Sequence, residues 1–303
     1  MTALPTFAPN ANQLDTLTRI NLGDVYEALG VAHWRRGRFL LDTLFWLPAR
    51  RFARQVIRFD TLVGERGLPA AAEWLIRLYI HQLQVAGREH VPECGPALLL
   101  SNHPGLADTL AAFIAINRDD LLIIARERPF TKALPNINRK LIYVPDDTLG
   151  RIAATRAVLY RLREGAIILT CPAGRIEPDP AVMPDAIASL EGWAQSISFY
   201  ARNVPELKIV PMIVSGVFAP GALRNPLTRL RRTRAGREHM AAMLQVLWPG
   251  YQRVTVRVAI GPSLLAKDLL AAKRDPTRAT IEAARALIEH PPTDWQTLVT
   301  GIR

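Results

Sequence analysis

Residues 97–110 read ALLLSNHPGLADTL, and this stretch decides the fold of the chain. A short, continuous apolar run that ends at turn residues is typical of a strand buried on both faces. Pro104 and Gly105 then break the chain, and an apolar segment that can form a helix follows Asp108. The stretch therefore predicts a buried strand, a tight loop that carries His103, and a helix.

The same alternation of apolar strands and helices continues from residue 85 to the end of the chain. Further strands are predicted at 121–125, 141–144, 166–170, 208–214 and 253–260. Helices are predicted at 108–117, 149–164, 185–201 and 237–247, and a last helix from Thr277 to before Pro291. This pattern indicates an α/β fold with a mixed, largely parallel sheet that is covered by helices on both faces.

Two of these segments allow sharper predictions. In the helix at 149–164, Ile152, Leu159 and Leu162 fall on one face, and Gly165 stands where a helix C-cap is expected. In the last strand, valines alternate with polar residues. That alternation predicts a strand at an edge of the sheet or half exposed.

The N-terminal part differs from the rest, and we expect a helical segment at 1–84 followed by a second domain at 85–303. Its central stretch interleaves large apolar side chains with arginines: Phe39, Leu40, Leu44, Phe45, Trp46 and Phe52 with Arg35, Arg36, Arg38, Arg50, Arg51 and Arg54. Such a mixture suits a helix that lies in the headgroup region of a membrane. The alternative is a solvated basic face beside a face that packs on the core. A second apolar helix after Gly67 would complete a membrane-apposed helical pair.

The composition indicates a folded protein with an anionic partner. The chain has 303 residues, of which 49% are hydrophobic, and a formal net charge of +11. A charge of this size favours a nucleic acid, a phospholipid surface or a phosphorylated substrate as the partner, without choosing among them.

The sequence gives no support for disulfides, a metal site or a membrane-spanning helix. Cys94 and Cys171 are the two cysteines, and neither lies in a Cys-x-x-Cys or Cys/His pattern. The first residues, MTALPTFAPNANQLD, lack the basic stretch and apolar core of a secretory signal. The longest apolar windows, 39–48 and 68–80, are shorter than the roughly 20 residues that cross a bilayer. We therefore expect a peripheral protein of a reducing cytoplasm.

His103 lies just past the carboxyl end of its predicted strand, where α/β sheets bind their ligands. Histidine titrates near neutral pH, and a carboxylate bound to one ring nitrogen leaves the other free to accept a proton. Asp108 can reach back to the ring from the start of the next helix. The alternative is that Asp108 only caps the helix and His103 is an ordinary loop residue. With six histidines and 27 acidic residues, about half of one His-x4-acid match is expected by chance. The position of His103 and Asp108 between a strand and a helix is therefore stronger evidence than their spacing.

The stretch Asn102-His103-x4-Asp108 resembles the motif of the glycerolipid and lysophospholipid acyltransferases, members of the phospholipid/glycerol acyltransferase superfamily. The likeness extends from Val85 to Pro262. It rests on four blocks in the family's order: VAGREHVPECGPALLLSNH (85–103), LTCPAGRIEP (169–178), KIVPMIVSG (208–216) and VRVAIGPSL (256–264). Four blocks in order are more specific than any one of them.

The resemblance implies direct transfer of a fatty acyl group from acyl-CoA or acyl carrier protein to a hydroxyl of a lysophospholipid or a glycerol-phosphate-like acceptor. His103 would be the general base, Asp108 would orient it, and Asn102 would help to bind substrate. No metal or other cofactor is implied. The partners would be the thioester donor, the lipid acceptor and the cytoplasmic face of the membrane, with no nucleic acid.

The second block, CPAGRIEP, departs from the family's Phe-Pro-Glu-Gly sequence. Ala173 replaces the glutamate, and Arg175 follows Gly174 directly. Pro172 and Gly174 still predict a tight turn that offers N–H groups and the Arg175 guanidinium to a phosphate. The alternative is an ordinary turn with a solvated arginine. Glu177 is a candidate to supply the missing carboxylate.

A further block, NRKLIYVPDD, carries Asp146 and Asp147 where the family often has an arginine that contacts the acceptor phosphate. Arg139 lies just upstream and is a candidate to replace that arginine. The two aspartates make a neutral, zwitterionic or amino-lipid acceptor plausible. Alternatively, they only begin the next helix.

A second class of function is a non-catalytic basic protein that binds an anionic membrane or nucleic acid on a degenerate form of this fold. The arginine-rich stretch LRNPLTRLRRTRAGRE (223–238) suits such a partner, although it also suits a solvated face. A pure binding protein has no need of a base at the end of a strand, and the chain lacks the signatures of nucleic-acid-binding modules. The sequence therefore favours the acyltransferase.

Overall fold

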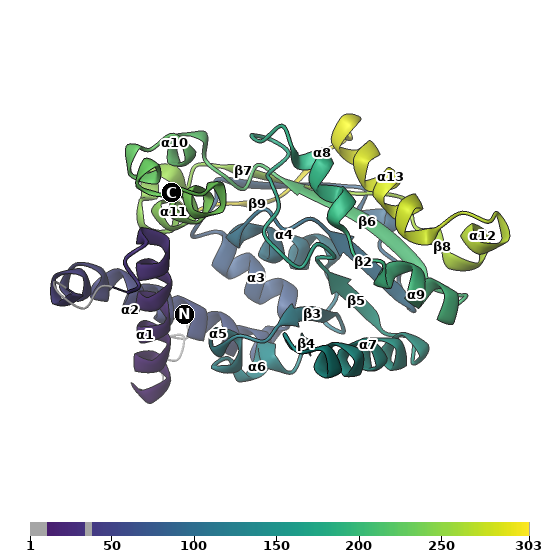
Figure 1. Cartoon of the computed structure of the whole chain (residues 1–303), viewed down its shortest axis with the longest axis horizontal. Helices are drawn as coiled ribbons and strands as arrows, with labels where there is room; N and C mark the ends of the chain where they lie inside the picture. The colour runs from purple at the N-terminus through teal and green to yellow at the C-terminus, as the bar shows by residue number, and fades with distance from the viewer. Residues whose placement is uncertain (1–10, 34–37, 303) are drawn as a thin grey trace, which may run out of the picture.

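The computed structural model describes residues 11–33 and 38–302, and these residues form one sheet of nine strands (Figure 1). The strands are β1 (Gln82–Ala86), β2 (Ala97–Ser101), β3 (Leu122–Arg126), β4 (Leu141–Val144), β5 (Ile167–Thr170), β6 (Lys208–Ser215), β7 (Thr255–Ile260), β8 (Leu264–Leu265) and β9 (Gln296–Thr300). Their order is β4-β3-β5-β2-β6-β7-β1-β9, and β8 pairs with β6. The run from β4 to β6 is parallel, whereas β7 is antiparallel to β6 and β9 is antiparallel to β1. The predicted mixed, largely parallel sheet is confirmed.

The described helices lie on both faces of this sheet. They are α1 (Ala11–Leu29), α2 (Arg38–Arg66), α3 (Leu68–Ile76), α4 (Leu106–Ile116), α5 (Pro129–Lys132), α6 (Pro135–Asn138), α7 (Thr148–Arg163), α8 (Ala186–Ser189), α9 (Ser196–Asn203), α10 (Pro220–Leu223), α11 (Arg234–Leu247), α12 (Ala266–Ala271) and α13 (Pro276–Glu289). In Figure 1, α1 and α2 lie at one end of the molecule and α12 and α13 at the other. Within the described ranges, no helix is both long enough and apolar enough to cross a membrane.

Strand β2 shows why the sheet needs cover on both sides. All five of its residues are buried. Ala97 and Leu99 join a core cluster shared with α1, α2, α3 and α4. Leu98 and Leu100 point the other way, into a cluster shared with α7, α9, α12 and α13. Because successive side chains alternate across a strand, an apolar run of this kind is stable only between two layers of helices.

The expected boundary between residues 84 and 85 falls inside β1. The N-terminal helices also share their core with the sheet, because Leu17 of α1 and Val56 of α2 lie in the same cluster as Leu99 of β2. The helical character expected for this part is present in α1, α2 and α3. These helices are built into the main core of the described chain.

Two predictions about single elements hold only in part. Strand β7 is not at an edge, because β1 pairs with its outer side and β9 pairs with β1. It is half exposed, as the other alternative held, because Val256 and Val258 are buried while Arg257 is exposed. In α7, the buried residues are Ala154, Val158 and Leu162, whereas Ile152 is 45% exposed. Leu162 and Leu159 of the predicted face do pack against the core, Leu159 partly buried, so Ile152 is the predicted residue that lies outside. The predicted cap at Gly165 is consistent with its positive φ of 85°.

Candidate active site

His103 follows β2 by two residues, and its position is fixed by the residue before it. Asn102 is 2% exposed, and its side chain pairs with the backbone of Val214 in β6: Nδ2 donates to the Val214 carbonyl at 2.9 Å, and Oδ1 accepts from the Val214 N–H at 2.7 Å. Both ends of the Asn102 amide are therefore used within the fold. The contact ties the start of the His103 loop to the neighbouring strand.

The His103 ring is bound to Asp108, as the strand-loop-helix pattern predicts. Nδ1 lies 2.7 Å from Oδ2 of Asp108, which is 2% exposed in the first turn of α4. The same oxygen accepts the Gly105 N–H at 3.0 Å. Because a carboxylate only accepts hydrogen bonds, Nδ1 carries the proton and Nε2 is left as the acceptor. The His103 side chain is 32% exposed, so substrate can reach it.

The surroundings of the ring favour its protonated form. The charge of Asp108 raises the pKa of His103, while burial of the ring acts in the opposite direction. The charge of Glu177 also raises this pKa, and that of Arg128 lowers it. An imidazole of this kind accepts a proton readily when a hydroxyl is placed against Nε2.

The loop after β5 lies beside this pair, because β5 and β2 are adjacent parallel strands. The predicted tight turn is present: the Gly174 N–H donates to the Cys171 carbonyl at 3.0 Å, and Gly174 has a φ of 62°. Pro172 accepts a hydrogen bond from Ala194 through its carbonyl. Arg175 is exposed and lies against Gly192. The turn thus holds a guanidinium on the same edge of the sheet as His103.

Cys171 begins this loop but is unsuited to act as a nucleophile. Burial, together with the charges of Asp108 and Glu177, raises the pKa of its thiol well above the ordinary value. The thiol therefore stays protonated at neutral pH, and a protonated thiol attacks carbonyl groups poorly.

Glu177, three residues past the turn, binds the backbone of His103 directly. Its Oε2 accepts the His103 N–H at 3.1 Å, and its own N–H donates to the His103 carbonyl at 2.9 Å. Oε1 accepts from the indole N–H of Trp193 at 3.0 Å. Burial raises the pKa of the Glu177 carboxyl to about 7, against these hydrogen bonds, which lower it.

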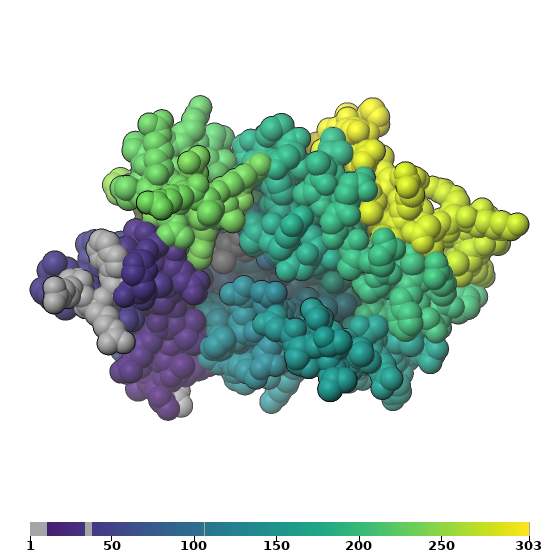
Figure 2. All heavy atoms as spheres, viewed as in Figure 1, coloured from purple at the N-terminus to yellow at the C-terminus, as the bar shows by residue number. Residues whose placement is uncertain are grey.

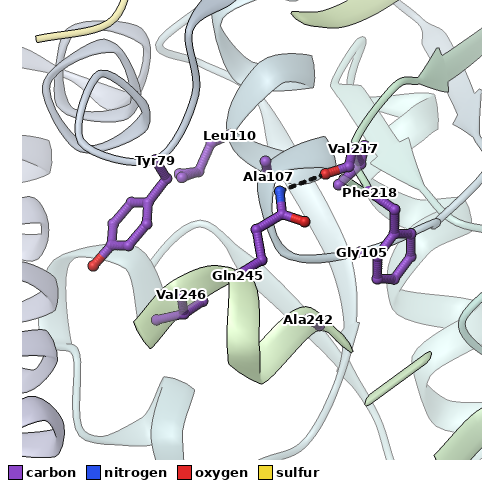
Figure 3. Close-up of a pocket in the computed structure, with 9 residues that line it drawn as sticks. All are labelled: Tyr79, Gly105, Ala107, Leu110, Val217, Phe218, Ala242, Gln245 and Val246. Atoms are coloured by element: carbon purple, nitrogen blue, oxygen red, sulfur yellow. Dashed lines mark hydrogen bonds between the residues drawn. The ribbon is translucent and has the colours of Figure 1, made fainter. Parts of the chain in front are cut away.

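A small apolar pocket, partly open to solvent, borders the His103 loop (Figure 3). Its lining comes from the loop and α4, from the segment after β6, from α11 and from the turn after α3: Gly105, Ala107, Leu110, Val217, Phe218, Ala242, Gln245, Val246 and Tyr79. Gln245 holds one wall in place, because its Nε2 donates to the Val217 carbonyl at 2.7 Å and its Oε1 accepts the Ala219 N–H at 2.9 Å. The pocket offers an apolar group a place two residues from the base.

Arg139 is not brought to this site. It directly follows α6 and precedes β4, and the strands from β4 to β2 are parallel. A residue before β4 therefore lies at the opposite edge of the sheet from His103, which follows β2. We correct the expected contribution of Arg139 accordingly.

The two aspartates after β4 have other partners. The Asp147 side chain caps α7 by accepting the Gly150 N–H at 2.8 Å, so this residue begins a helix, as one of the two alternatives held. Asp146 is exposed and lies 3.3 Å from Arg126.

Arg128 is a candidate that the sequence interpretation missed. It follows β3, whose carboxyl end lies at the same edge of the sheet as that of β2, and it is exposed. Its charge acts on the ring of His103. The rule that singled out His103, a polar residue just past a buried strand, would also have found Arg128.

Part of the arginine-rich stretch is used inside the fold. Arg234 pairs with Asp185 at 2.5 Å and with Glu238 at 2.8 Å. The Arg231 side chain lies against Gly30 at the end of α1 and against Gly236 of α11. Arg234 is therefore a paired cation, and Arg231 packs between the end of α1 and α11.

No protein-family model matches the chain, and no curated protein matches its sequence. Among solved structures, the chain is similar to the crystal structure of the 1-acyl-sn-glycerophosphate (LPA) acyltransferase, PlsC, from Thermotoga maritima. The identity is 14%, the alignment covers 94% of this chain and 98% of that chain, and the TM-score is 0.44.

Proposed function

We propose that this chain is an O-acyltransferase of the glycerolipid and lysophospholipid type, with His103 as the general base and Asp108 as its orienting carboxylate. The observation that carries the proposal is the 2.7 Å contact between His103 Nδ1 and Asp108 Oδ2 at the carboxyl edge of the sheet, next to an apolar pocket. A carboxylate, an imidazole with one free nitrogen and a place for an alkyl chain are the parts that acyl transfer to a hydroxyl needs.

The reaction would proceed through a tetrahedral intermediate. Nε2 of His103 takes the proton of the acceptor hydroxyl as its oxygen attacks the thioester carbon. The tetrahedral intermediate then collapses, the carbon–sulfur bond breaks, and the thiolate of CoA or acyl carrier protein takes the proton from the imidazolium. Asp108 stabilises the imidazolium in between.

The acyl chain and the phosphate group of the substrates would bind at different places beside the base. The acyl chain suits the apolar pocket beside Gly105, because burial of methylene groups is favourable. Arg175 and Arg128 are exposed guanidinium groups on the same edge of the sheet, and they suit a phosphate of the acceptor or of the donor. The acceptor class we propose is a lysophospholipid or a glycerol-phosphate-like molecule.

Contact with a membrane would come from the first half of α2. Five of its large apolar residues are exposed: Phe39 (68%), Leu40 (61%), Leu44 (66%), Trp46 (38%) and Leu47 (70%). Phe45 and Phe52 of the same predicted set pack inside instead, Phe52 against Phe130 with ring centroids 6.5 Å apart. Arg35 and Arg36 lie outside the described residues. An exposed apolar patch of this kind, flanked by arginines, supports a peripheral membrane site.

The test is an acyl-transfer assay of the purified chain with labelled acyl-CoA and acyl carrier protein as donors. The acceptors are lysophospholipids, glycerol 3-phosphate and an amino-lipid. We expect transfer to at least one acceptor and a loss of about 10²- to 10⁴-fold in His103→Ala, the usual contribution of a general base. The exposed His290, at the end of α13, provides the control: His290→Ala should keep full activity. Wild-type activity in His103→Ala would refute the mechanism, and no transfer to any acceptor would refute the function.

A further inference from the structure

Two buried carboxylates lie on the loop after β5, and each binds a different part of the site. Glu177 is 1% exposed and Asp179 is 0% exposed. The hydrogen-bond partners of both are N–H and O–H groups. Burial of a carboxylate without a paired cation is costly, so such groups require a reason in the fold or in the chemistry.

The geometry at Glu177 calls for a carboxylate and not for an amide. Its Oε2 accepts the His103 N–H at 3.1 Å, and its Oε1 accepts the Trp193 indole N–H at 3.0 Å and the Ser189 hydroxyl at 3.4 Å. A glutamine has one acceptor oxygen, so its NH₂ group would face one of these donors. The return hydrogen bond from the Glu177 N–H to the His103 carbonyl ties the two backbones together at 2.9 Å.

Asp179 makes a comparable set of contacts on the pocket side. Its carboxylate accepts the N–H groups of Gly216 at 2.8 Å, of Phe218 at 2.9 Å and of Ala181 at 3.0 Å. Phe218 and its neighbour Val217 line the apolar pocket. One loop therefore holds the base through Glu177 and the pocket wall through Asp179.

We propose that Glu177 is a positioning residue for the acyl transfer, which holds the backbone of His103 and sets a second negative charge beside its ring. This inference rests on the function proposed above. The charge matters when His103 takes the proton, because the charges of Asp108 and Glu177 both favour the imidazolium. Asp179, in contrast, has no such role toward the base and serves as the matched control.

Several other groups also face this pair. Asp108 binds the ring, and the charge of Arg128 acts on it from the loop after β3. The charges of Asp108 and Glu177 also act on the Cys171 thiol, whose pKa they raise. Arg175 lies on the same loop as Glu177. Asp108 and Glu177 stabilise the imidazolium, Arg128 opposes them, and the thiol is neutral. Removal of the Glu177 charge should therefore lower the pKa of His103.

The kinetic test compares Glu177→Gln with Asp179→Asn in the acyl-transfer assay. We expect Glu177→Gln to lower kcat by about 10- to 100-fold with KM for the acyl donor little changed, because the base is misplaced but the pocket is intact. Asp179→Asn should mainly raise KM for the acyl donor. The double variant Glu177→Gln with Trp193→Phe should recover part of kcat, because the amide oxygen can then face His103 while its NH₂ group faces the Ser189 hydroxyl, which can accept while it donates to the Ala186 carbonyl.

A second measurement does not depend on activity. The imidazole carbon and nitrogen signals of His103, followed by NMR against pH, report its protonation in each variant. The wild type should show two steps, because His103 and Glu177 interact and Glu177 titrates at about 7. Glu177→Gln should show one step at a lower pH, and Asp179→Asn should keep two.

The outcomes separate this inference from the proposed function. Equal losses of kcat in Glu177→Gln and Asp179→Asn, or a His103 titration that does not change without Glu177, would overturn the positioning role. If the wild type transfers no acyl group, the function fails while the NMR titration still decides the coupling. The one-dimensional NMR spectrum of each variant shows whether it is folded.

Discussion

At the scale of single residues, the site rests on carboxylates with more than one partner. Asp108 binds the His103 ring and the Gly105 N–H through the same oxygen, while its other oxygen accepts the Thr109 hydroxyl at 3.0 Å. The orientation of the base is therefore fixed by a side chain that is itself held in three directions. Such a group loses little conformational freedom when substrate binds.

This arrangement predicts how Asp108→Asn changes the pH dependence of acyl transfer. The charge of Asp108 raises the pKa of His103 above the ordinary value for histidine, and the base must be neutral to act. Wild-type kcat/KM should therefore fall as the pH drops through this raised pKa. In Asp108→Asn the charge is lost, so the fall should move to lower pH, while the plateau drops by about 10²-fold or more. An acid limb that stays in place would show that Asp108 does not set the ionisation of the base.

The direction of each strand predicts at which end of the sheet the residues next to it lie, and this was the part of the site that the sequence could predict. His103 and Asp108 were found because a strand that ends in a loop places the next residue at the carboxyl edge of the sheet. The same rule excludes Arg139, which comes before its strand, and it includes Arg128, which comes after one. The contact of Glu177 with His103 joins residues 74 positions apart, and no local pattern reports it.

At the scale of elements, helix α7 shows that the residues a helix buries can differ from those that its hydrophobic periodicity predicts. The sequence places Ile152 and Leu162 on one face, but Leu162 is 0% exposed and Ile152 is 45% exposed. The small Ala154 and the branched Val158 let the helix lie close to the sheet. Close approach thus favours a face that a search for large apolar residues does not select.

The two positions should differ clearly in their effect on stability. Leu162→Ala removes a fully buried side chain, and we expect a loss of about 2–5 kcal/mol in the free energy of unfolding. Ile152→Ala should stay within about 0.5 kcal/mol of the wild type, because that side chain already contacts water. Urea unfolding followed by circular dichroism measures both. A large loss at Ile152 would mean that the predicted face is the one that packs.

Strands β1 and β9 were missed for a related reason. Their sequences, QLQVA and QTLVT, are short and mix glutamine and threonine with few apolar residues. Both lie at one side of the sheet, where a single buried face is sufficient. The alternation of valines with polar residues in β7 allowed an edge position, but β1 and β9 extend the sheet beyond it. The strands that are apolar throughout, such as β2, were the ones that the sequence predicted well.

At the scale of the whole molecule, α1 links the helix of the proposed membrane contact to the region of the site, because it packs on α2 and contacts α11. The N-terminal helices meet the region of α11 at one end of the molecule, and α11 also lines the apolar pocket (Figure 2). On the face shown, the surface is hollowed between these purple and green segments and the teal middle of the chain. The helix proposed to contact a membrane and a helix that lines the pocket therefore both contact α1.

This placement predicts that the exposed face of α2 controls membrane binding. Leu40, Leu44 and Leu47 follow one helical stripe and are 61–70% exposed, so changing all three to serine should leave the core intact. We expect this variant to bind vesicles of anionic phospholipid at least about tenfold more weakly in flotation, since each leucine contributes favourable transfer free energy. The matched control is Leu149→Ser with Ile152→Ser on α7, which also removes exposed apolar side chains. Equal binding by the α2 variant and the wild type would place the membrane contact elsewhere, and loss of binding in the α7 control alone would move it to that helix.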